Sequence, residues 1–329
     1  MILVVGGTGE LGTAVVRNLL TQGRDVAVMT RSAGSADRAR RMGAVPVTGD
    51  LRDPTSLAGI CNGVDAVVAT ANTIVPGRGE RAVPGALKAG YEELARQAQC
   101  AGVRRLVFVS VPRTVIGQGA AEFDDKREVE EILLRHGTPT TVIRPSLFMQ
   151  SWLPAVGSRL ALAGAEHATL ERGFWLARFV GATTHRSLDR FSVALVPGDG
   201  RARHSFVGVG EVAEAVAASI DLAGRHDELD VGGPEALSWR EVASIHAEVL
   251  GKRAVMMRTP TSPLRLGSWL LRPLSPAAAS LLAVQRVVAR VSTGCSPDTT
   301  TSLLGRPPTS VREFLGARLA DRSYDGAEL

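Results

Sequence analysis

The stretch GGTGELG, residues 6–12, decides the fold of this chain. It follows the apolar run ILVV (residues 2–5) and leads into LGTAVVRNLLTQG (residues 11–23), where apolar side chains recur every four residues. Glycines at this point permit a tight turn, and they leave room for the helix to pack closely on the strand. The order strand, glycine loop and helix therefore predicts the first turn of a parallel α/β sheet.

The same loop is expected to bind a phosphate group. Gly6, Gly9 and Gly12 satisfy the spacing GxxGxxG, and Gly7, Gly9 and Gly12 satisfy GxGxxG. Backbone N–H groups at the start of a helix, together with the helix dipole, attract the pyrophosphate of a dinucleotide. The loop thus predicts dinucleotide binding, and a glycine turn kept only for packing is the alternative.

Short apolar runs alternate with amphipathic stretches through the first half of the chain, which is typical of parallel strands joined by crossover helices. The expected strands cover residues 2–5, 25–29, 44–47, 65–69, 105–110 and 140–143. The predicted fold class is α/β, a Rossmann-type doubly wound parallel sheet. Residues 1–150 form the predicted dinucleotide-binding domain. Residues 151–329 form a smaller, mixed α/β substrate-side region that is partly interleaved with it.

The second half of the chain lacks the regular alternation of strands and helices seen in the first half. Helices are predicted over residues 207–224 and 237–251, and a pair of strands around the turn PGDGR at residues 197–201. Residues 264–291 are apolar, but arginines and prolines interrupt them, so no membrane span is expected. A helical wall or lid over a pocket is the preferred interpretation of this stretch, and contact with a membrane surface is the alternative. Candidates for the core of this region are Phe174, Trp175 and Phe179.

Composition limits the functional classes. The chain has 329 residues, 45% of them hydrophobic, and a formal net charge of +5 from 38 basic and 33 acidic residues. The basic residues are scattered, so nucleic-acid binding is not expected. The three cysteines match no disulfide or zinc spacing, and HExxH and GxSxG motifs are absent, so the sequence supports neither a metalloenzyme nor a hydrolase.

The chain begins with an apolar strand and no signal-like leader, so a cytoplasmic location is expected. Its dominance of arginine, alanine and glycine indicates a GC-rich bacterial source. The expected partner is a small-molecule substrate, and the oligomeric state is left open between monomer and homodimer.

The end of the second expected strand bears on the choice of cofactor. An acidic residue there would accept the ribose hydroxyls of NAD, but the chain has Thr30, Arg31 and Ser32. The planar guanidinium of Arg31 suits a 2′-phosphate. We therefore expect NADP(H) to be preferred over NAD(H), against the alternative that Arg31 is a solvated loop charge.

The order of motifs resembles that of the atypical short-chain dehydrogenase/reductases of the NmrA-like group. The motifs are GGTGELG, GDLRDPTSL (49–57), VVATAN (67–72), AGVRRLVFVS (101–110), DDKREVEEIL (124–133) and TVIRPSLFMQSW (141–152). VGGPEALSWREVA (231–243) and LLGRPPTSVREFL (303–315) are similar to C-terminal signatures of the same sugar-epimerase-like superfamily. This group includes reductases, epimerase-like proteins and redox-sensing regulators.

The resemblance implies cofactor contacts by position. The implied residues are Thr8, Gly9, Glu10 and Leu11 at the pyrophosphate, Asp50 and Leu51 at the adenine, Ala71 and Asn72 beside the ribose, and Pro145 and Ser146 near the nicotinamide. The alternative to a cofactor contact is that Asp50 and Asn72 are loop or cap residues and that Pro145 only ends the sixth expected strand.

Active short-chain reductases use a serine after the fifth strand and a tyrosine four residues before a lysine. Ser110 and Lys126 match the serine and the lysine, but Glu122 stands in the tyrosine position. Without the phenol the usual proton route is lost. Lys126 is expected to contact the cofactor, polarise a substrate oxygen or act as a base, with a structural role as the alternative. Ser110 either bonds a substrate carbonyl or caps a turn.

Glu122 lies one helical turn before Lys126, and a surface ion pair between them is the preferred hypothesis. An apolar substrate pocket is expected from Phe123, Phe148, Met149 and Trp152, which are alternatively core between the two halves.

Two functions remain open on the sequence. One is an NADPH-dependent reductase of a fairly apolar carbonyl compound, such as a quinone or a polyketide-type ketone, or a related epimerase or dehydratase. The other is a non-catalytic NADP-binding redox sensor that acts through a protein partner.

Overall fold

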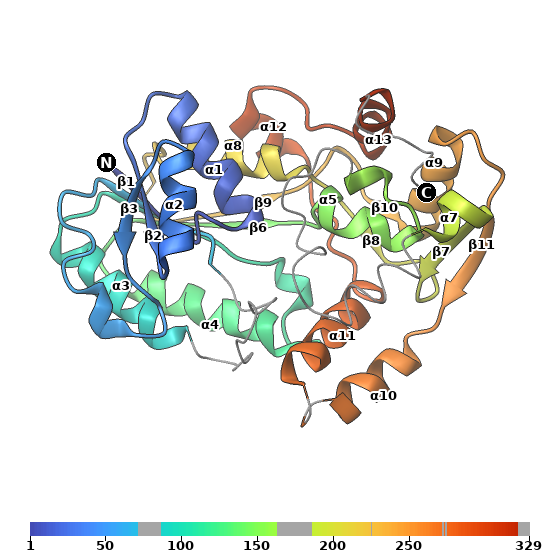
Figure 1. Cartoon of the computed structure of the whole chain (residues 1–329), viewed down its shortest axis with the longest axis horizontal. Coiled ribbons are helices and arrows are strands. Elements are labelled where there is room, and N and C mark those ends of the chain that lie inside the picture. The colour runs from blue at the N-terminus through green and yellow to red at the C-terminus, as the bar shows by residue number, and fades with distance from the viewer. Residues whose placement is uncertain (72–86, 163–185, 225, 272, 274, 322–329) are drawn as a thin grey trace.

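The computed structural model describes residues 1–71, 87–162, 186–224, 226–271, 273 and 275–321. Within these residues seven parallel strands form one sheet in the order β3-β2-β1-β4-β5-β6-β9 (Figure 1). Their bounds are β1 Ile2–Val5, β2 Val26–Thr30, β3 Val45–Thr48, β4 Ala66–Ala69, β5 Arg105–Val109, β6 Thr140–Pro145 and β9 His226–Val231. Strands β1 to β3 are added toward one edge of the sheet, and β4 and the later strands are added on the other side of β1. This change in strand order confirms the predicted Rossmann-type α/β fold.

Helices cover both faces of the sheet, as Figure 1 shows. One face carries α1 (Glu10–Thr21), α2 (Ala33–Arg41) and α8 (Val209–Ser219), and the other carries α3 (Lys88–Cys100) and α4 (Ala121–Arg135). Side chains of β1 alternate between the two layers: Ile2 and Val4 pack with α1, and Leu3 and Val5 pack with α3. Both layers are apolar, so the central strands β1, β2, β4, β5 and β6 are buried on both faces, whereas the edge strands β3 and β9 are partly exposed.

The remaining elements belong mainly to the second half. They are η1 Pro54–Leu57, η2 Arg113–Val115, α5 Met149–Trp152, η3 Leu153–Val156, η4 Leu160–Leu162, α7 Ser187–Phe191, β7 Val193–Pro197, β8 Arg203–His204, β10 Leu237–Ser238, α9 Trp239–Val249, β11 Val255–Thr259, α10 Ser262–Leu271, α11 Pro276–Val288, α12 Asp298–Leu304 and α13 Val311–Ala320. The predicted helices at residues 207–224 and 237–251 are confirmed as α8 and α9. The apolar stretch at residues 264–291 falls in α10 and α11.

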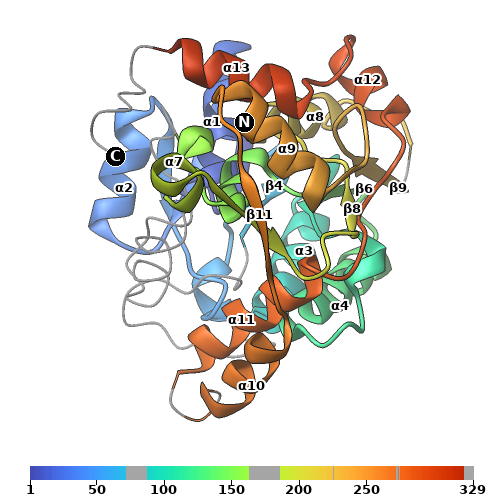
Figure 2. The same ribbon diagram turned by 90° about the vertical axis from the view of Figure 1, so that its right-hand side faces the viewer.

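The predicted strand pair around residues 197–201 is wrong. Strands do flank this turn, but β7 pairs in parallel with β11 and β8 pairs antiparallel with β10. Figure 2 shows β11 on the face of the molecule turned toward the viewer. The turn residues indicated a reversal of the chain correctly, but they carried no information on which distant strand each arm would join.

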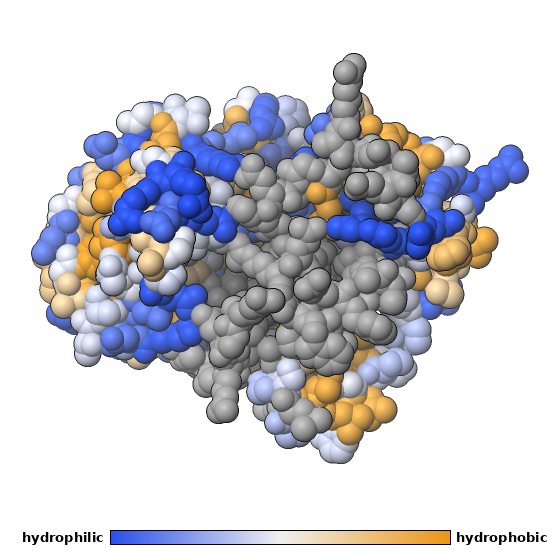
Figure 3. Space-filling view, in the orientation of Figure 1, coloured by the Kyte–Doolittle hydropathy of each residue, from blue (hydrophilic) through white to orange (hydrophobic). Residues whose placement is uncertain are grey.

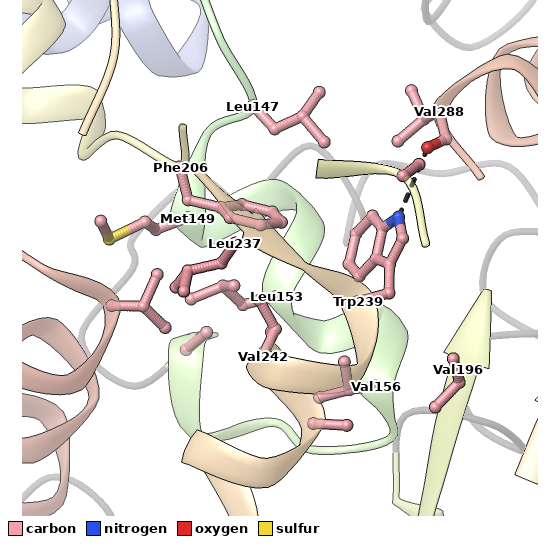
Figure 4. Close-up of a cluster of buried hydrophobic side chains, with 14 of the residues drawn as sticks. Leu147, Met149, Leu153, Val156, Val196, Phe206, Leu237, Trp239, Val242 and Val288 are labelled. Carbon is pink, nitrogen blue, oxygen red and sulfur yellow. Dashed lines mark hydrogen bonds between the residues drawn. The ribbon is translucent and has the colours of Figure 1, made fainter. Parts of the chain in front are cut away.

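The second half has an apolar core of its own, which Figure 4 shows around Trp239. Trp239 is 1% exposed, its ring meets Phe206 edge-on at 5.3 Å between centroids, and its Nε1 donates to the Val288 carbonyl at 3.4 Å. Phe123 from α4 belongs to the same cluster. This core therefore joins the C-terminal elements to the helix that carries Lys126.

A buried ion pair holds α4 against the sheet. Arg144 on β6 binds Glu130 on α4 through two hydrogen bonds, Nη2 to Oε2 at 2.7 Å and Nε to Oε1 at 3.1 Å. Both side chains are almost fully buried, at 3% and 2% exposure. Nη1 of Arg144 also bonds Glu228 on β9 at 2.8 Å. The pair thus fixes the position of α4 relative to two strands.

Replacing Arg144 with methionine should destabilise the fold by about 3–5 kcal/mol, because the Glu130 carboxylate stays buried after it loses its bidentate partner. The double variant Arg144→Met/Glu130→Met should recover most of that loss, since no buried charge is left. Urea unfolding measures both variants. A double variant as unstable as the single one would contradict this origin of the effect.

Candidate functional site

The glycine loop is packed so closely that side chains would not fit. Gly6 has a φ of +87°, and a Cβ there would lie 2.7 Å from the backbone nitrogen of Ala71. A Cβ on Gly12 would overlap the carbonyl oxygen of Gly6. These two contacts bring the loop against the residue that follows β4 and bring α1 against the loop.

The start of α1 fits a dinucleotide pyrophosphate. Its N-cap residue is Gly9, which has no side chain to cap the first turn. The backbone N–H groups and the positive end of the helix dipole are thus presented at the carboxyl edge of the sheet. Leu11 packs its side chain into the core, so only its backbone faces this edge. The Glu10 carboxylate accepts a hydrogen bond from Ser151 at 3.1 Å. Contacts of Thr8, Gly9, Glu10 and Leu11 with the cofactor stay predictions.

Arg31 lies at the surface immediately after β2, where a 2′-phosphate is expected. Ser32 is the N-cap of α2, and its hydroxyl accepts a hydrogen bond from the Ser35 N–H at 3.3 Å. Asp50 follows β3, and its Oδ1 accepts from the Arg52 N–H at 3.0 Å. Leu51 is buried. The residues predicted for the 2′-phosphate and the adenine thus lie at the carboxyl ends of β2 and β3. Ala71, predicted beside the ribose, follows β4, and Asn72 lies outside the described residues.

Lys126 is buried at the carboxyl ends of β4 and β5. Its Nζ donates to the carbonyl oxygen of Val109 at 2.7 Å and to that of Ala71 at 3.3 Å. It also lies 4.6 Å from the ring centroid of Phe108. An ammonium group has three donors, and the third has no acceptor among the described residues. Lys126 therefore reaches the same backbone junction that the glycine loop contacts.

Burial changes the acidity of this amine. The loss of solvation lowers the pKa of the Lys126 ammonium from 10.5 to about 7, and the Glu130 carboxylate one turn later opposes that shift in part. A group with a pKa near 7 exists in both forms at neutral pH, which suits the transfer of a proton.

The predicted surface ion pair between Glu122 and Lys126 is wrong. Both side chains are buried, and the described structure contains no ion pair between them. Oε1 of Glu122 instead accepts a hydrogen bond from Ser280 on α11, and Oε2 has no hydrogen-bond partner. The two residues lie one turn apart, but the C-terminal core packs over the start of α4 and removes Glu122 from solvent.

The hydroxyl groups of Ser110 and Ser146 differ in whether they already have a hydrogen-bond partner. The Ser110 hydroxyl is buried directly after β5 and has no hydrogen-bond partner among the described residues, so it can bond a ligand. The Ser146 hydroxyl donates to the Thr293 carbonyl at 2.9 Å. Pro145 ends β6 beside it. The Ser146 N–H is also engaged, since it donates to the Val231 carbonyl at 2.8 Å. Contact of Pro145 and Ser146 with the nicotinamide stays a prediction.

The four residues predicted for the pocket pack mostly with the core. Phe123 and Met149 are buried in the cluster around Trp239, and Trp152 packs against it half-buried. Phe148 packs against the opposite layer, beside α1 and α8. A role in lining a substrate pocket stays a prediction for all four residues. Phe174, Trp175 and Phe179 lie outside the described residues.

Two residues near Lys126 were not anticipated. Tyr91 on α3 donates its hydroxyl to the Ala71 carbonyl at 2.7 Å, so this oxygen accepts from both the phenol and the lysine. Burial raises the pKa of Tyr91, which keeps the phenol protonated. Ser280 bonds Glu122 from a distance of 158 residues along the chain. The spacing of apolar residues along α3 indicates that Tyr91 is buried. No local sequence pattern indicates that Ser280 would bond Glu122.

Comparison with known proteins identifies the family. A model described as NAD(P)H-binding matches residues 6–171, just over half of the chain. The chain belongs to the NAD(P)H-binding family. The matched part of this NAD(P)H-binding protein contains the glycine loop, Lys126 and Ser146, so the motifs that led to the prediction of dinucleotide binding lie within the family region.

Several relatives of this NAD(P)H-binding protein are reductases. It is 26% identical over 319 residues to a (4-alkanoyl-5-oxo-2,5-dihydrofuran-3-yl)methyl phosphate reductase from Streptomyces griseus, over 95% of this chain and 96% of the other. It is 26% identical to an NAD(P)H azoreductase from Xenophilus azovorans, over 77% and 74% of the two chains. The match to the photosystem II assembly factor Ycf39 of Synechocystis is 31% identical but spans only 45% of each chain.

Solved structures share the fold. The Citrobacter triphenylmethane reductase in complex with NADP(H) superposes with a TM-score of 0.71 at 18% identity, over 97% of this chain and all of the other. An NADPH-dependent quinone oxidoreductase from Escherichia coli in complex with NADPH gives 0.69 at 18% identity, with the same coverage. A nucleoside-diphosphate-sugar epimerase from Staphylococcus aureus also superposes on this NAD(P)H-binding protein, with a TM-score of 0.69 at 18% identity. At these identities the solved structures show a shared fold, whereas the family rests on the NAD(P)H-binding model.

Substituting Gly12 with alanine should weaken NADPH binding by at least about tenfold, because the new methyl group displaces the Gly6 backbone that shapes the loop. Gly34 is the matched control: it lies in α2, and a Cβ there meets nothing within 4 Å. Gly34→Ala should leave binding unchanged and stabilise the helix by about 0.5–1 kcal/mol. Fluorescence titration with NADPH measures binding. Equal affinities for the two variants would contradict the proposed packing.

The low pKa of Lys126 predicts how stability depends on pH. Between about pH 7 and pH 10 the unfolded lysine binds its proton more fully than the folded one, so this residue makes stability rise with pH across that window. Lys126→Met lacks the effect. Its stability relative to the wild type should therefore fall by about 2 kcal/mol between about pH 6 and pH 9 in urea unfolding. A difference that is constant with pH would show that Lys126 titrates normally.

Proposed function

We propose that the protein is an NADPH-dependent reductase that transfers a hydride to a fairly apolar carbonyl compound of the quinone or polyketide-ketone class, with Lys126 as the proton donor. The observation that carries this proposal is the position of Lys126 Nζ between the carbonyl oxygens of Ala71 and Val109, with its pKa lowered to about 7. An ammonium in this setting can protonate the substrate oxygen and regain its proton at neutral pH.

The chain's own residues divide the remaining work. The start of α1 and the glycine loop bind the pyrophosphate, and Arg31 contacts the 2′-phosphate. Bound NADPH supplies the hydride. Ser110 donates its unpaired hydroxyl to the substrate oxygen and orients it toward Lys126. In the balanced reaction a carbonyl takes up one hydride and one proton and becomes an alcohol, and NADP⁺ is released.

Both the relatives and the composition of the site support this function. Two of the relatives named above, the azoreductase and the methyl phosphate reductase, are reductases by name, and two of the structures named above are complexes with NADPH or NADP(H). The tyrosine that normally delivers the proton is replaced by Glu122, whose Oε1 is engaged by Ser280. Lys126 is therefore the better candidate for proton transfer among the described residues that match the motif.

The reductase proposal is tested by the loss of NADPH absorbance with a panel of quinones and polycyclic ketones. Lys126→Met should lower kcat by about a hundredfold or more, as expected when a general acid is lost. For the wild type, kcat/KM should fall as pH rises through about 7, because the ammonium form is consumed. Lys88→Met is the matched control: Lys88 is partly exposed, pairs with Glu128 at the surface, and should leave kcat unchanged.

Three outcomes decide between the alternatives. Turnover that is unaffected by Lys126→Met would remove the lysine from the mechanism and leave the reductase in place. Tight NADPH binding without turnover on any substrate of the panel would favour a redox sensor. Equal affinities for NADPH and NADH, unchanged in Arg31→Ala, would contradict the preference for NADP(H).

A further inference from the structure

One long segment of the chain carries positive charge only. Between Glu248 and Asp298 no acidic residue occurs, whereas the segment contains seven basic residues: Lys252, Arg253, Arg258, Arg265, Arg272, Arg286 and Arg290. The rest of the chain mixes both signs, since the whole molecule has a formal net charge of only +5. The uncompensated charge therefore concentrates in the segment that contains β11, α10 and α11.

The same segment exposes most of the large apolar side chains found at the surface. Six of the ten exposed large hydrophobic residues in the described structure lie on β11 and α10: Val255, Met256, Met257, Leu266, Trp269 and Leu270. Trp269 is 70% exposed and Leu266 57% exposed. In Figure 3, hydrophobic surface gathers over α10, which lies at the rim of the molecule in Figures 1 and 2.

Helix α10 is apolar on two sides, but among the described residues it packs on only one. Its inner side meets α11, where a Cβ on Gly267 would lie 3.0 Å from the side chain of Leu282. Leu266, Trp269 and Leu270 follow the spacing i, i+3, i+4, so they form a second stripe that faces outward. No residue of α10 is buried. An outward apolar stripe of this kind needs an occupant.

Exposed arginines lie on the same segment of the chain as this stripe, one of them on α10 itself. Arg253, Arg258 and Arg265 are exposed, and none of them makes an ion pair with a described carboxylate. Leucine and tryptophan beside arginine are the composition of helices that lie in the interface of a bilayer with anionic lipids. A second copy of the chain fits less well, because two such surfaces would bring arginines against arginines.

We propose that β11 and α10 form a docking surface for an anionic lipid bilayer. Leu266, Trp269 and Leu270 enter the boundary between headgroups and acyl chains, and the arginines bind the lipid phosphates. None of the described helices is both long and apolar enough to cross a membrane, so the protein would lie on the surface. This inference stands without the proposed reductase activity.

The test is sedimentation of the full chain with vesicles of phosphatidylcholine alone or mixed in equal parts with phosphatidylglycerol. The protein should bind the mixed vesicles at least about tenfold more tightly, and salt should weaken binding. The double variant Leu266→Ser/Trp269→Ser should lose binding, whereas Leu319→Ser, an exposed leucine on α13, should retain it. Unchanged NADPH affinity confirms that each variant is folded.

A second measurement places the tryptophan. Lipids brominated in their acyl chains should quench part of the wild-type tryptophan fluorescence, and Trp269→Phe should bind the vesicles but lose most of that quenching. Equal binding to both kinds of vesicle, or undiminished binding by the double variant, would overturn the proposal. So would a wild-type dimer that becomes a monomer in the double variant without any vesicle binding, because the surface would then join two copies.

Discussion

The backbone of Ala71 is the junction on which the candidate site depends. Its nitrogen lies against Gly6, so only a glycine loop can approach β4 this closely. Its carbonyl oxygen accepts from Lys126 on α4 and from Tyr91 on α3. One peptide unit thus connects the glycine turn to the buried amine. The glycine loop and Lys126 are far apart in sequence, yet both contact the backbone of Ala71 at the carboxyl edge of the sheet.

Burial gives Lys126 its chemical character, and the second half of the chain contributes to that burial. The core around Trp239 covers the start of α4 through Phe123, and α11 reaches Glu122 through Ser280. The pair of Arg144 and Glu130 holds the helix on the sheet and leaves a carboxylate near the amine.

Much of the fold could be predicted from local patterns. Five of the six predicted strands match to within one residue, and the sixth continues to Pro145. Strand β9 was missed because HDELDV is rich in charge, as suits an edge strand with one exposed face. The partners of β7 and β8 and the burial of Glu122 depend on contacts between distant segments, on which helical and strand periods carry no information. The resemblance to short-chain reductases singled out Lys126 and Ser110, whereas neither it nor the helical period indicated the partners of Glu122.

The chain offers a direct probe of the central claim, since Lys88, Lys126 and Lys252 are its only lysines. With lysine labelled with ¹³C at the ε carbon, an NMR titration should resolve their signals, and the signal absent from Lys126→Met belongs to Lys126. That signal should titrate with a pKa of about 7 and move when NADPH binds. A midpoint near about 10.4, the value of a solvated lysine, and no response to NADPH would contradict a buried proton donor at the cofactor site.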